Sequence, residues 1–355
     1  MEISNRSASP TWAEIQQQPE TWLTTLALMA NHPATANIRA LRRDAILSGA
    51  GSSAYAAGAV AAAWPGARQI PTTDVLTEAE RLPQARMMLS LARSGNSPES
   101  IGAIERIRRF QPSIEHFAIT CNADGRLAQE PGMTAIVLDP RTNDRGLAMT
   151  SSFTNMVLAG LCVSHGDELG AALPALCRKV SQRAAELSER AEKLAQTLPR
   201  RVVVLAPPLL LPCAREAALK ILELTAGKIA VLAETFLGLR HGPMSFLDAD
   251  TVILAFVSSN QQTRCYEEDV LAELRAKKLG KLVGILPEGC HPAMVDEAIP
   301  AVAGALPDFL RTPFEIVYAQ LLAYHLSLRA GLDPDHPSPA GVISRVVQGF
   351  TIYPD

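Results

Sequence analysis

Short aliphatic runs alternate regularly with longer helical stretches along this chain, and the whole pattern occurs twice. This alternation limits the possible folds more than any other feature of the sequence. In the first half, buried strands are predicted at Asp44–Ser48, Arg86–Ala92, Phe117–Cys121 and Thr134–Leu138. Strands that alternate with helices form parallel sheets covered by helices on both faces. The sequence therefore predicts an α/β fold with a mostly parallel sheet flanked by helices.

The second half restarts the pattern after a polar helical stretch from Leu169 to Leu198. A strand followed by a serine turn, as in Met87–Ser97, occurs again at Val252–Asn260. We interpret this echo as two copies of one module. The other predicted elements are helices at Ser53–Trp64, Pro98–Phe110, Gly125–Glu130, Cys213–Thr225 and Cys265–Lys278, and strands at Arg201–Ala206, Lys228–Ala233, Thr251–Val257 and Lys281–Leu286.

Composition narrows the class of protein. The chain has 355 residues, of which 48% are hydrophobic, which is enough for two cores. Its 33 Lys and Arg against 36 Asp and Glu give a net charge of −3, so no nucleic-acid or membrane partner is expected. The six cysteines include no Cys-x-x-Cys and indicate reduced thiols. We expect a cytoplasmic enzyme without a metal.

A glycine turn between a strand and a helix lies at residues 46–54. Such a turn brings backbone N–H groups toward an anion, and Ser52 and Ser53 add hydroxyl donors beside Gly51. Glycine and serine are also common wherever a strand leads into a helix. The same glycines match a loose dinucleotide pattern, with Asp74 downstream, so a nicotinamide-dependent dehydrogenase stays open as an alternative.

A second loop of this kind, Arg93-Ser94-Gly95-Asn96-Ser97, precedes a helix predicted to begin at Pro98. Ser97 alone would be explained as a helix cap. Two serine-rich helix starts in one parallel sheet converge on a single phosphate, whereas a dinucleotide site needs only one of them. The pair of loops therefore favours a phosphate site.

Three charged residues form a stripe on an otherwise apolar helix. Glu216, Lys220 and Glu223 are four and then three residues apart, so they share one face. A solvated helix would explain the spacing, but the surrounding Ala, Leu and Ile indicate burial, and buried charges must be paired or used. A carboxylate beside a lysine can move a proton on a carbon next to a carbonyl. His241 follows in a turn-like Arg-His-Gly-Pro segment.

Together these motifs resemble the sugar isomerase (SIS) family, and in particular its AgaS-type tagatose-6-phosphate ketose/aldose isomerases, which are related to galactosamine-6-phosphate deaminases. The resemblance implies two tandem SIS modules, each a flavodoxin-like three-layer sandwich. The stretches that carry it are Ala92–Ser100, Asp144–Ser152, Leu222–Lys228 and Arg345–Gly349. On this basis the expected domains are a helical arm (1–40), a phosphosugar-binding SIS domain (41–167), a linking helix (168–200), a second SIS domain with the catalytic helix (201–333) and a tail (334–355).

The resemblance also implies a role for each motif. Glu223 would move a proton between C1 and C2 of the sugar, Lys220 and Glu216 would assist, and His241 would open the ring. Arg345 falls where a more distant relative, the isomerase half of glucosamine-6-phosphate synthase, has a tail lysine, but a guanidinium cannot act as a base. The substrate would be held by Gly51, Ser52, Ser53, Arg93, Ser94, Gly95, Asn96, Ser97, Thr150 and Ser151.

The expected activity is the interconversion of aldose and ketose forms of a hexose or hexosamine 6-phosphate, with ammonia released from a 2-amino substrate. No organic cofactor is needed for such a proton transfer. The resemblance implies a homodimer or larger assembly. No second phosphate is expected, because Pro207–Pro212 replaces the glycine turn in the second module. The alternatives that stay open are a non-catalytic phosphosugar-sensing SIS protein and the nicotinamide-dependent dehydrogenase.

Overall fold

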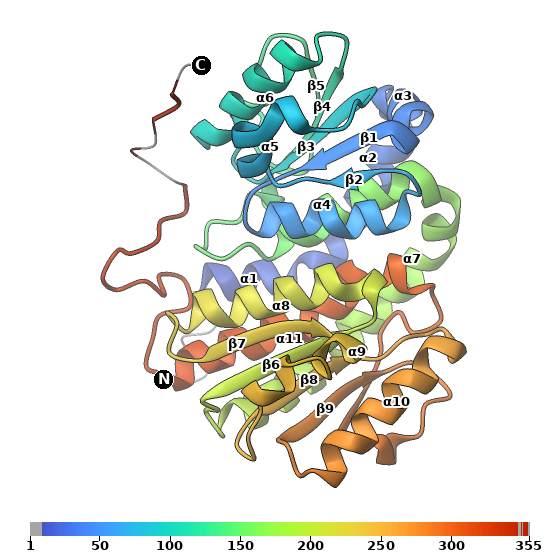
Figure 1. The fold of residues 1–355 in the computed structure, drawn as a ribbon, viewed down its shortest axis with the longest axis vertical. Helices are drawn as coiled ribbons and strands as arrows, with labels where there is room; N and C mark the ends of the chain where they lie inside the picture. The colour runs from blue at the N-terminus through green and yellow to red at the C-terminus, as the bar shows by residue number, and fades with distance from the viewer. Residues whose placement is uncertain (1–8, 347–348, 350, 354–355) are drawn as a thin grey trace. The chain divides into compact units, whose positions relative to one another are not determined.

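The computed structural model describes residues 9–346, 349 and 351–353, and the chain divides into two compact units (Figure 1). The first unit contains Gln17–Cys177 and the segment from Ala340 onward. The second unit contains Arg178–Pro339 and the segment up to Gln16. Each unit has its own five-stranded parallel sheet flanked by helices, which confirms the predicted fold of two tandem α/β modules.

The sheet of the first unit has the strand order β2-β1-β3-β4-β5. Helix α4 contacts β1, β2 and β3 on one face, while α5 and α6 pack together on the other (Figure 1). The middle strands β1 and β3 are almost wholly buried, as aliphatic strands covered on both faces must be. The elements are α2 (Gln18–Asn31), α3 (Ala34–Leu41), β1 (Ala45–Ser48), α4 (Ser52–Ala63), β2 (Arg68–Gln69), α5 (Thr72–Glu78), β3 (Met87–Ala92), α6 (Pro98–Phe110), β4 (Glu115–Thr120) and β5 (Met133–Val137).

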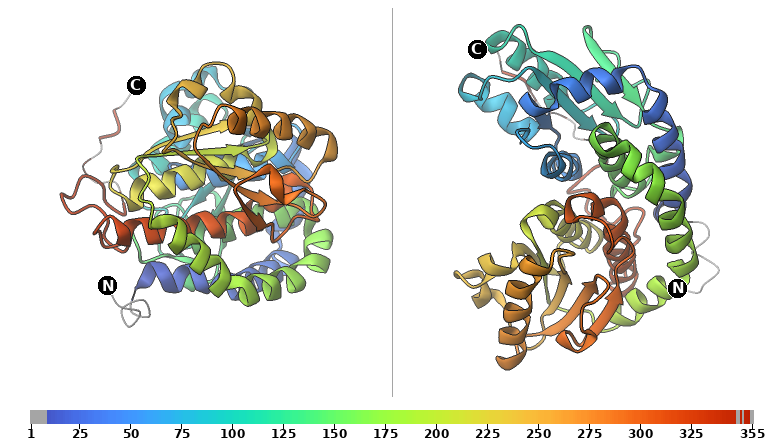
Figure 2. Two further views of the ribbon diagram at one scale, coloured as in Figure 1. Left: turned by 90° about the horizontal axis from the view of Figure 1, so that it is seen from below. Right: turned by 90° about the vertical axis from the view of Figure 1, so that its right-hand side faces the viewer.

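The sheet of the second unit repeats this arrangement. Its order, β10-β9-β8-β6-β7, places successive strands in the same positions as in the first sheet. Helices α8 and α11 pack against each other, and α10 packs with α9; Figure 2 shows the layers from two further directions. The elements are α1 (Pro10–Gln16), β6 (Arg201–Ala206), α8 (Leu211–Leu224), β7 (Ala230–Thr235), α9 (Phe236–Leu239), β8 (Val252–Phe256), α10 (Gln261–Ala276), β9 (Lys281–Leu286), β10 (Glu297–Pro300) and α11 (Asp308–Arg329).

One long helix, α7 (Ser151–Ala195), runs from the first unit into the second. It begins well before the predicted start at Leu169, because the buried residues 151–163 continue the helical pattern. His165 has a non-helical backbone (φ −129°) and marks a kink. No helix among the described residues is long and apolar enough to cross a membrane.

All the predicted strands are present, but one predicted helix is absent, and several helices, α11 among them, were not predicted. Residues 125–130 form successive turns instead of a helix. Gly125 lies so close to the loop after β3 that a Cβ at this position would be 2.4 Å from the carbonyl oxygen of Ser94. Helix α11 was not predicted at all, because it is apolar around most of its surface and carries Pro313 near its start. Almost every residue of α11 is buried.

Candidate active site

Two serine turns lie side by side in the first unit. β1 and β3 are parallel neighbours, with Ser48 opposite Ser90, so their carboxyl ends meet at one edge of the sheet. This is the point where the strand order reverses, which is where ligands bind in open α/β sheets. Helices α4 and α6 both begin here without a side-chain hydrogen bond to cap them. The N–H groups in the first turns of these helices, apart from Pro98, which has none, are therefore suited to an anion.

The two glycines of the first turn are required for different reasons, Gly49 for close packing and Gly51 for its positive φ. A Cβ at Gly49 would be 2.4 Å from the carbonyl carbon of Ser53, so only glycine fits there. Gly51 has φ +56° and precedes the first residue of α4, with open space around it. Ser52 and Ser53 are buried, each with 4% of its surface exposed. The Ser53 hydroxyl points toward the sulfur of Met149 at 3.9 Å.

The second turn is fixed by its own hydrogen bonds. The N–H of Asn96 donates to Ser94 Oγ (3.3 Å), and Asn96 Oδ1 accepts from the N–H of Arg126 (3.1 Å). Gly95 has φ +63°, a left-handed conformation that favours glycine. The hydroxyl of Ser97 donates to the carboxylate of Glu99. To bind a phosphate, this hydroxyl would exchange one anionic acceptor for another.

Arg93 lies at the same edge but is committed to the backbone. It is 7% exposed, and its guanidinium donates to the carbonyl oxygens of Gly146 (3.2 Å), Leu147 (3.0 Å) and Arg345 (2.9 Å). These three bonds tie the turn after β3 to the loop before α7 and to the carboxy-terminal segment. In this arrangement Arg93 holds these three segments together.

Arg345 makes the reciprocal contact from the carboxy-terminal segment. Its Nε and Nη2 donate to the carbonyl oxygen of Asp144 at 2.8 and 2.5 Å, and Nη2 also donates to Asn143 Oδ1 at 2.7 Å. The segment therefore belongs to the first unit through both the side chain and the backbone of Arg345. Val347, Gln348 and Phe350 of the expected tail (334–355) lie outside the described residues.

Thr150 and Ser151, two predicted substrate ligands, face the buried carboxylate of Asp144. Asp144 accepts from the N–H of Thr150 (2.7 Å), the hydroxyl of Ser151 (2.5 Å), and both the N–H (2.9 Å) and the hydroxyl (2.6 Å) of Ser152. The carboxylate thus caps the start of α7 from outside the helix. It also fixes the loop whose carbonyl groups hold Arg93 and Arg345.

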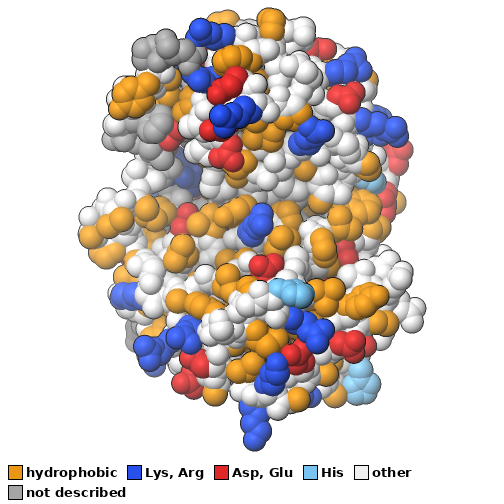
Figure 3. Space-filling model, in the orientation of Figure 1, with side chains coloured by type: hydrophobic (Ala, Val, Ile, Leu, Met, Phe, Trp, Pro, Cys, Tyr) orange, Lys and Arg blue, Asp and Glu red, His pale blue; other side chains and the backbone are white. Residues whose placement is uncertain are grey.

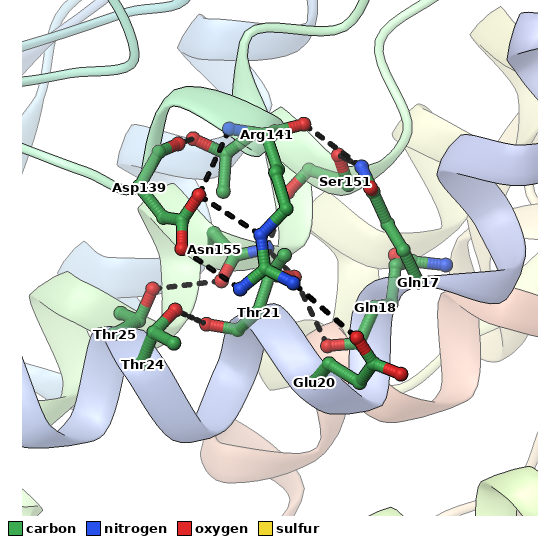
Figure 4. A network of polar contacts seen from close by, with 11 residues as sticks. Gln17, Gln18, Glu20, Thr21, Thr24, Thr25, Asp139, Arg141, Ser151 and Asn155 are labelled. Carbon is green, nitrogen blue, oxygen red and sulfur yellow. Dashed lines mark hydrogen bonds and ion pairs between the residues drawn. The ribbon is translucent and has the colours of Figure 1, made fainter.

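A polar network attaches this loop to α2 (Figure 4). Gln17 Nε2 donates to Ser151 Oγ (3.1 Å) and to the carbonyl oxygen of Arg141 (2.8 Å). Arg141 in turn pairs with Asp139 at 2.8 Å, and this hydrogen-bonded guanidinium lowers the pKa of Asp139. Asn155 of α7 donates to the hydroxyl of Thr21 at 2.8 Å. The loop before α7 is therefore held by hydrogen bonds to Arg93 on one side and by this network with Gln17 and α2 on the other.

The charged stripe lies on α8 in the second unit. Lys220 Nζ is 2.6 Å from Glu223 Oε2 and 3.3 Å from Glu216 Oε1. Lys220 and Glu216 are fully buried, whereas the side chain of Glu223 is 23% exposed. Burial opposes the charge on Lys220, but the two carboxylates together outweigh it and raise its pKa. Lys220 therefore stays charged at neutral pH, and Glu223 is the member of the stripe that solvent reaches.

His241 lies on the surface of the second unit, in the turn after α9. Its N–H donates to the carbonyl oxygen of Gly238 (3.0 Å), and the next residue, Gly242, has φ +121°. Met244 packs against the hydrophobic core of this unit. The described residues contain no cluster of His, Cys, Asp and Glu that could hold a metal ion.

The comparisons with known proteins agree with these features. No protein-family model matches the chain. It is 35% identical over 385 aligned positions to a D-galactosamine-6-phosphate deaminase AgaS of Escherichia coli O157:H7, covering 98% of this chain and 97% of that protein. The crystal structure of a tagatose-6-phosphate ketose/aldose isomerase from Escherichia coli superposes with a TM-score of 0.85 and 32% identity, covering 98% and 97% of the two chains.

The chain belongs to the AgaS-type SIS family. The resemblance drawn from the sequence is therefore confirmed. The fold extends further: the C-terminal domain of a glucosamine-fructose-6-phosphate aminotransferase from Francisella tularensis has a TM-score of 0.77 at 18% identity, over 92% of this chain and 98% of that chain. The dinucleotide alternative receives no support from these relatives, and Asp74 lies in the first turn of α5, where its carboxylate accepts from Thr73 (3.0 Å).

Sequence reasoning missed a second charged stripe in this SIS protein. Asp308, Arg311 and Glu315 are buried on α11, and Arg311 Nη1 is 2.8 Å from Asp308 Oδ1. Their spacing of three and four residues on an apolar helix is the signal that identified the stripe on α8. It went unused because the helix itself was not predicted. Asn143 and Asp144, the partners of Arg345, were also missed as site residues.

Proposed function

We propose that this AgaS-type SIS protein is an enzyme that interconverts the aldose and ketose forms of a hexose or hexosamine 6-phosphate and releases ammonia from a 2-amino substrate. The two relatives named above that share more than 30% identity with the chain are a D-galactosamine-6-phosphate deaminase and a tagatose-6-phosphate ketose/aldose isomerase. The observation that carries the proposal is the stripe on α8, where the buried, charged Lys220 holds the solvent-accessible carboxylate of Glu223 at 2.6 Å.

In the proposed reaction, Glu223 removes the proton from C2 of the open-chain sugar and returns a proton to C1. The charge on Lys220 stabilises the developing enediolate and keeps the carboxylate in one position. Because Lys220 is protonated at neutral pH, it cannot serve as the base. His241, as an exposed imidazole, is assigned to proton transfer in ring opening.

Deamination follows from the same proton transfer when C2 carries an amino group. Protonation at C1 then leaves an imine at C2. Water adds to this imine, and the C–N bond breaks to release ammonia and a ketose 6-phosphate. The net change consumes one water and needs no oxidant or reductant.

The phosphate is assigned to the serine turns of the first unit, with hydroxyls from Ser53, Ser94 and Ser97 and N–H groups from the starts of α4 and α6. The hydrogen bonds of Arg93 favour a role in holding the turn over direct contact with the phosphate. Ser151 is likewise assigned to hydrogen bonding with Asp144 through its hydroxyl, and Thr150 to the same role through its N–H.

The assembly is proposed to be a cytoplasmic homodimer or larger homo-oligomer. Hydrophobic side chains gather over α8 on the face that Figure 3 shows. Three large hydrophobic residues of the second unit, Leu209, Leu222 and Leu237, are 43%, 45% and 44% exposed. Exposed leucines of this kind suit contact with a second copy of the chain.

A direct assay tests the function. The protein is incubated separately with galactosamine-6-phosphate, glucosamine-6-phosphate and tagatose-6-phosphate, and ammonia and ketose or aldose products are measured. We expect ammonia and ketose from at least one amino sugar. Tight binding of a sugar phosphate without any turnover would instead identify a sensing protein.

A further inference from the structure

The turn after β8 in the second unit binds the carboxylate of Asp308, a residue of the same chain. Ser258 Oγ donates to Asp308 Oδ2 (2.5 Å), and the N–H and hydroxyl of Ser259 donate to Asp308 Oδ1 (2.8 and 3.0 Å). Arg311 Nη1 donates to the same oxygen at 2.8 Å. Two hydroxyls, an amide and a guanidinium are the donors that proteins use to bind carboxylates and phosphates.

This turn occupies the place that the phosphate turn has in the first unit. β8 and β3 are each the third strand of sheets with the same order, and a serine turn follows both. The two units differ at the helix that follows the fifth strand. The first turn of α11 contains Asp308, whereas the first turn of α7 contains no acidic residue and begins with Ser151.

A favourable interaction with the helix dipole does not explain this position of Asp308. An acidic residue in a first turn gains from the dipole while it points into solvent. Here Asp308 is only 6% exposed, and three of its four hydrogen bonds come from a turn some fifty residues away in sequence. The fully buried Arg311 also has an Nη2 without a hydrogen-bond partner among the described residues.

We propose that the turn at Val257–Asn260 is an anion-binding site of the second module, permanently occupied by the carboxylate of Asp308. The occupant excludes phosphate from this module. It also fixes the start of α11, the helix against which α8 packs. One copy of the duplicated module therefore keeps its anion site open for a ligand, and the other uses its site to hold the helix layer that carries Glu223.

Chemical rescue tests the proposal. Asp308→Ala removes the carboxylate, and sodium formate supplies a free one small enough to replace it. Melting temperatures are measured for the wild type and the variant in sodium formate and in sodium chloride of equal ionic strength. We expect formate to raise the melting temperature of Asp308→Ala by about 3 °C more than that of the wild type.

Two further variants separate rescue from general salt effects. Leu310→Ala removes a fully buried side chain from the same helix and should respond to formate as the wild type does. Asp308→Asn keeps the slot filled by a neutral side chain, so it should be destabilised without being rescued. An equal response to formate and chloride in Asp308→Ala, or an equal formate effect in Leu310→Ala, would overturn the proposal.

If Asp308→Ala does not accumulate as a folded protein, refolding from urea gives the same information. The refolded yield should rise with formate and not with chloride. Adding Ser258→Ala and Ser259→Ala to Asp308→Ala should weaken the formate effect, because both hydroxyl donors are then removed and only the N–H of Ser259 and the guanidinium of Arg311 remain. A yield that is the same in both salts would contradict the proposal. The outcome does not depend on the sugar substrate, so it is independent of the proposed activity.

Discussion

At the scale of single residues, Glu223 is the group on which the proposed chemistry depends. We predict that Glu223→Gln lowers kcat at least about 100-fold and changes KM only a few-fold, because the amide keeps the shape but cannot accept a proton. Glu273→Gln is a matched control: Glu273 is also 23% exposed, and its carboxylate is also 2.6 Å from a lysine, Lys277. The control should retain full activity. A Glu223→Gln enzyme with a tenth of the wild-type kcat would remove Glu223 from the proton transfer.

The serine turns give a second prediction at this scale. Ser94→Ala and Ser97→Ala should each weaken the binding of sugar phosphates by roughly 1–2 kcal/mol, because each removes a hydrogen bond to a charged group. Calorimetric titration with the substrate and with inorganic phosphate measures the loss. Thr77→Ala, which removes an exposed hydroxyl of the same unit that donates to the carbonyl oxygen of Thr73, should bind like the wild type. Unchanged affinity in both serine variants would move the phosphate site elsewhere.

At the scale of elements, the attachment of α10 to the turn after β8 depends on pH. Glu267 of α10 accepts the N–H of Ser258 (2.8 Å), and burial, followed by the nearby charge of Asp308, raises the pKa of Glu267 to about 7. A raised folded-state pKa means that the protonated acid stabilises the fold. Its contribution is fully present below the unfolded pKa and is lost as the pH rises through about 7. The free energy of unfolding in urea is measured for the wild type and for Glu267→Gln at pH 5 and pH 8. Between these pH values, the stability of Glu267→Gln relative to the wild type should rise by about 3 kcal/mol. Parallel pH profiles would refute the effect.

At the scale of the whole molecule, the prediction concerns subunits. The family resemblance implies that His241 acts from a neighbouring subunit, so each site of a dimer would combine Glu223 of one chain with His241 of the other. Glu223→Gln and His241→Asn homodimers should then both be nearly inactive. In a mixed dimer one site receives both changes and the other is intact, so complete random exchange should restore roughly a quarter of the wild-type activity. Verified mixed dimers that stay inactive would show that His241 does not act across subunits.

The amino-acid sequence alone specifies the repeated α/β pattern, because the spacing of aliphatic runs is a local property. It also determined which residue types could perform the chemistry: the serine turns stand where strands lead into helices, and Glu216, Lys220 and Glu223 share a helix face by spacing alone. Helix α11 escaped prediction for the converse reason. A helix buried on nearly all sides loses its amphipathic pattern, so only its neighbours reveal its place in the fold.

Hydrogen-bond partners from distant parts of the chain are visible only in the folded structure. Arg93 carries the same charge whether it meets a phosphate or three carbonyl groups. Only the folded loop before α7 and the carboxy-terminal segment show that its partners are Gly146, Leu147 and Arg345. The serines at 258 and 259 likewise match a phosphate turn in sequence, and only the packing of α11 brings Asp308 onto them. A sequence specifies which donors are present, but burial and long-range contact decide which acceptor satisfies each donor.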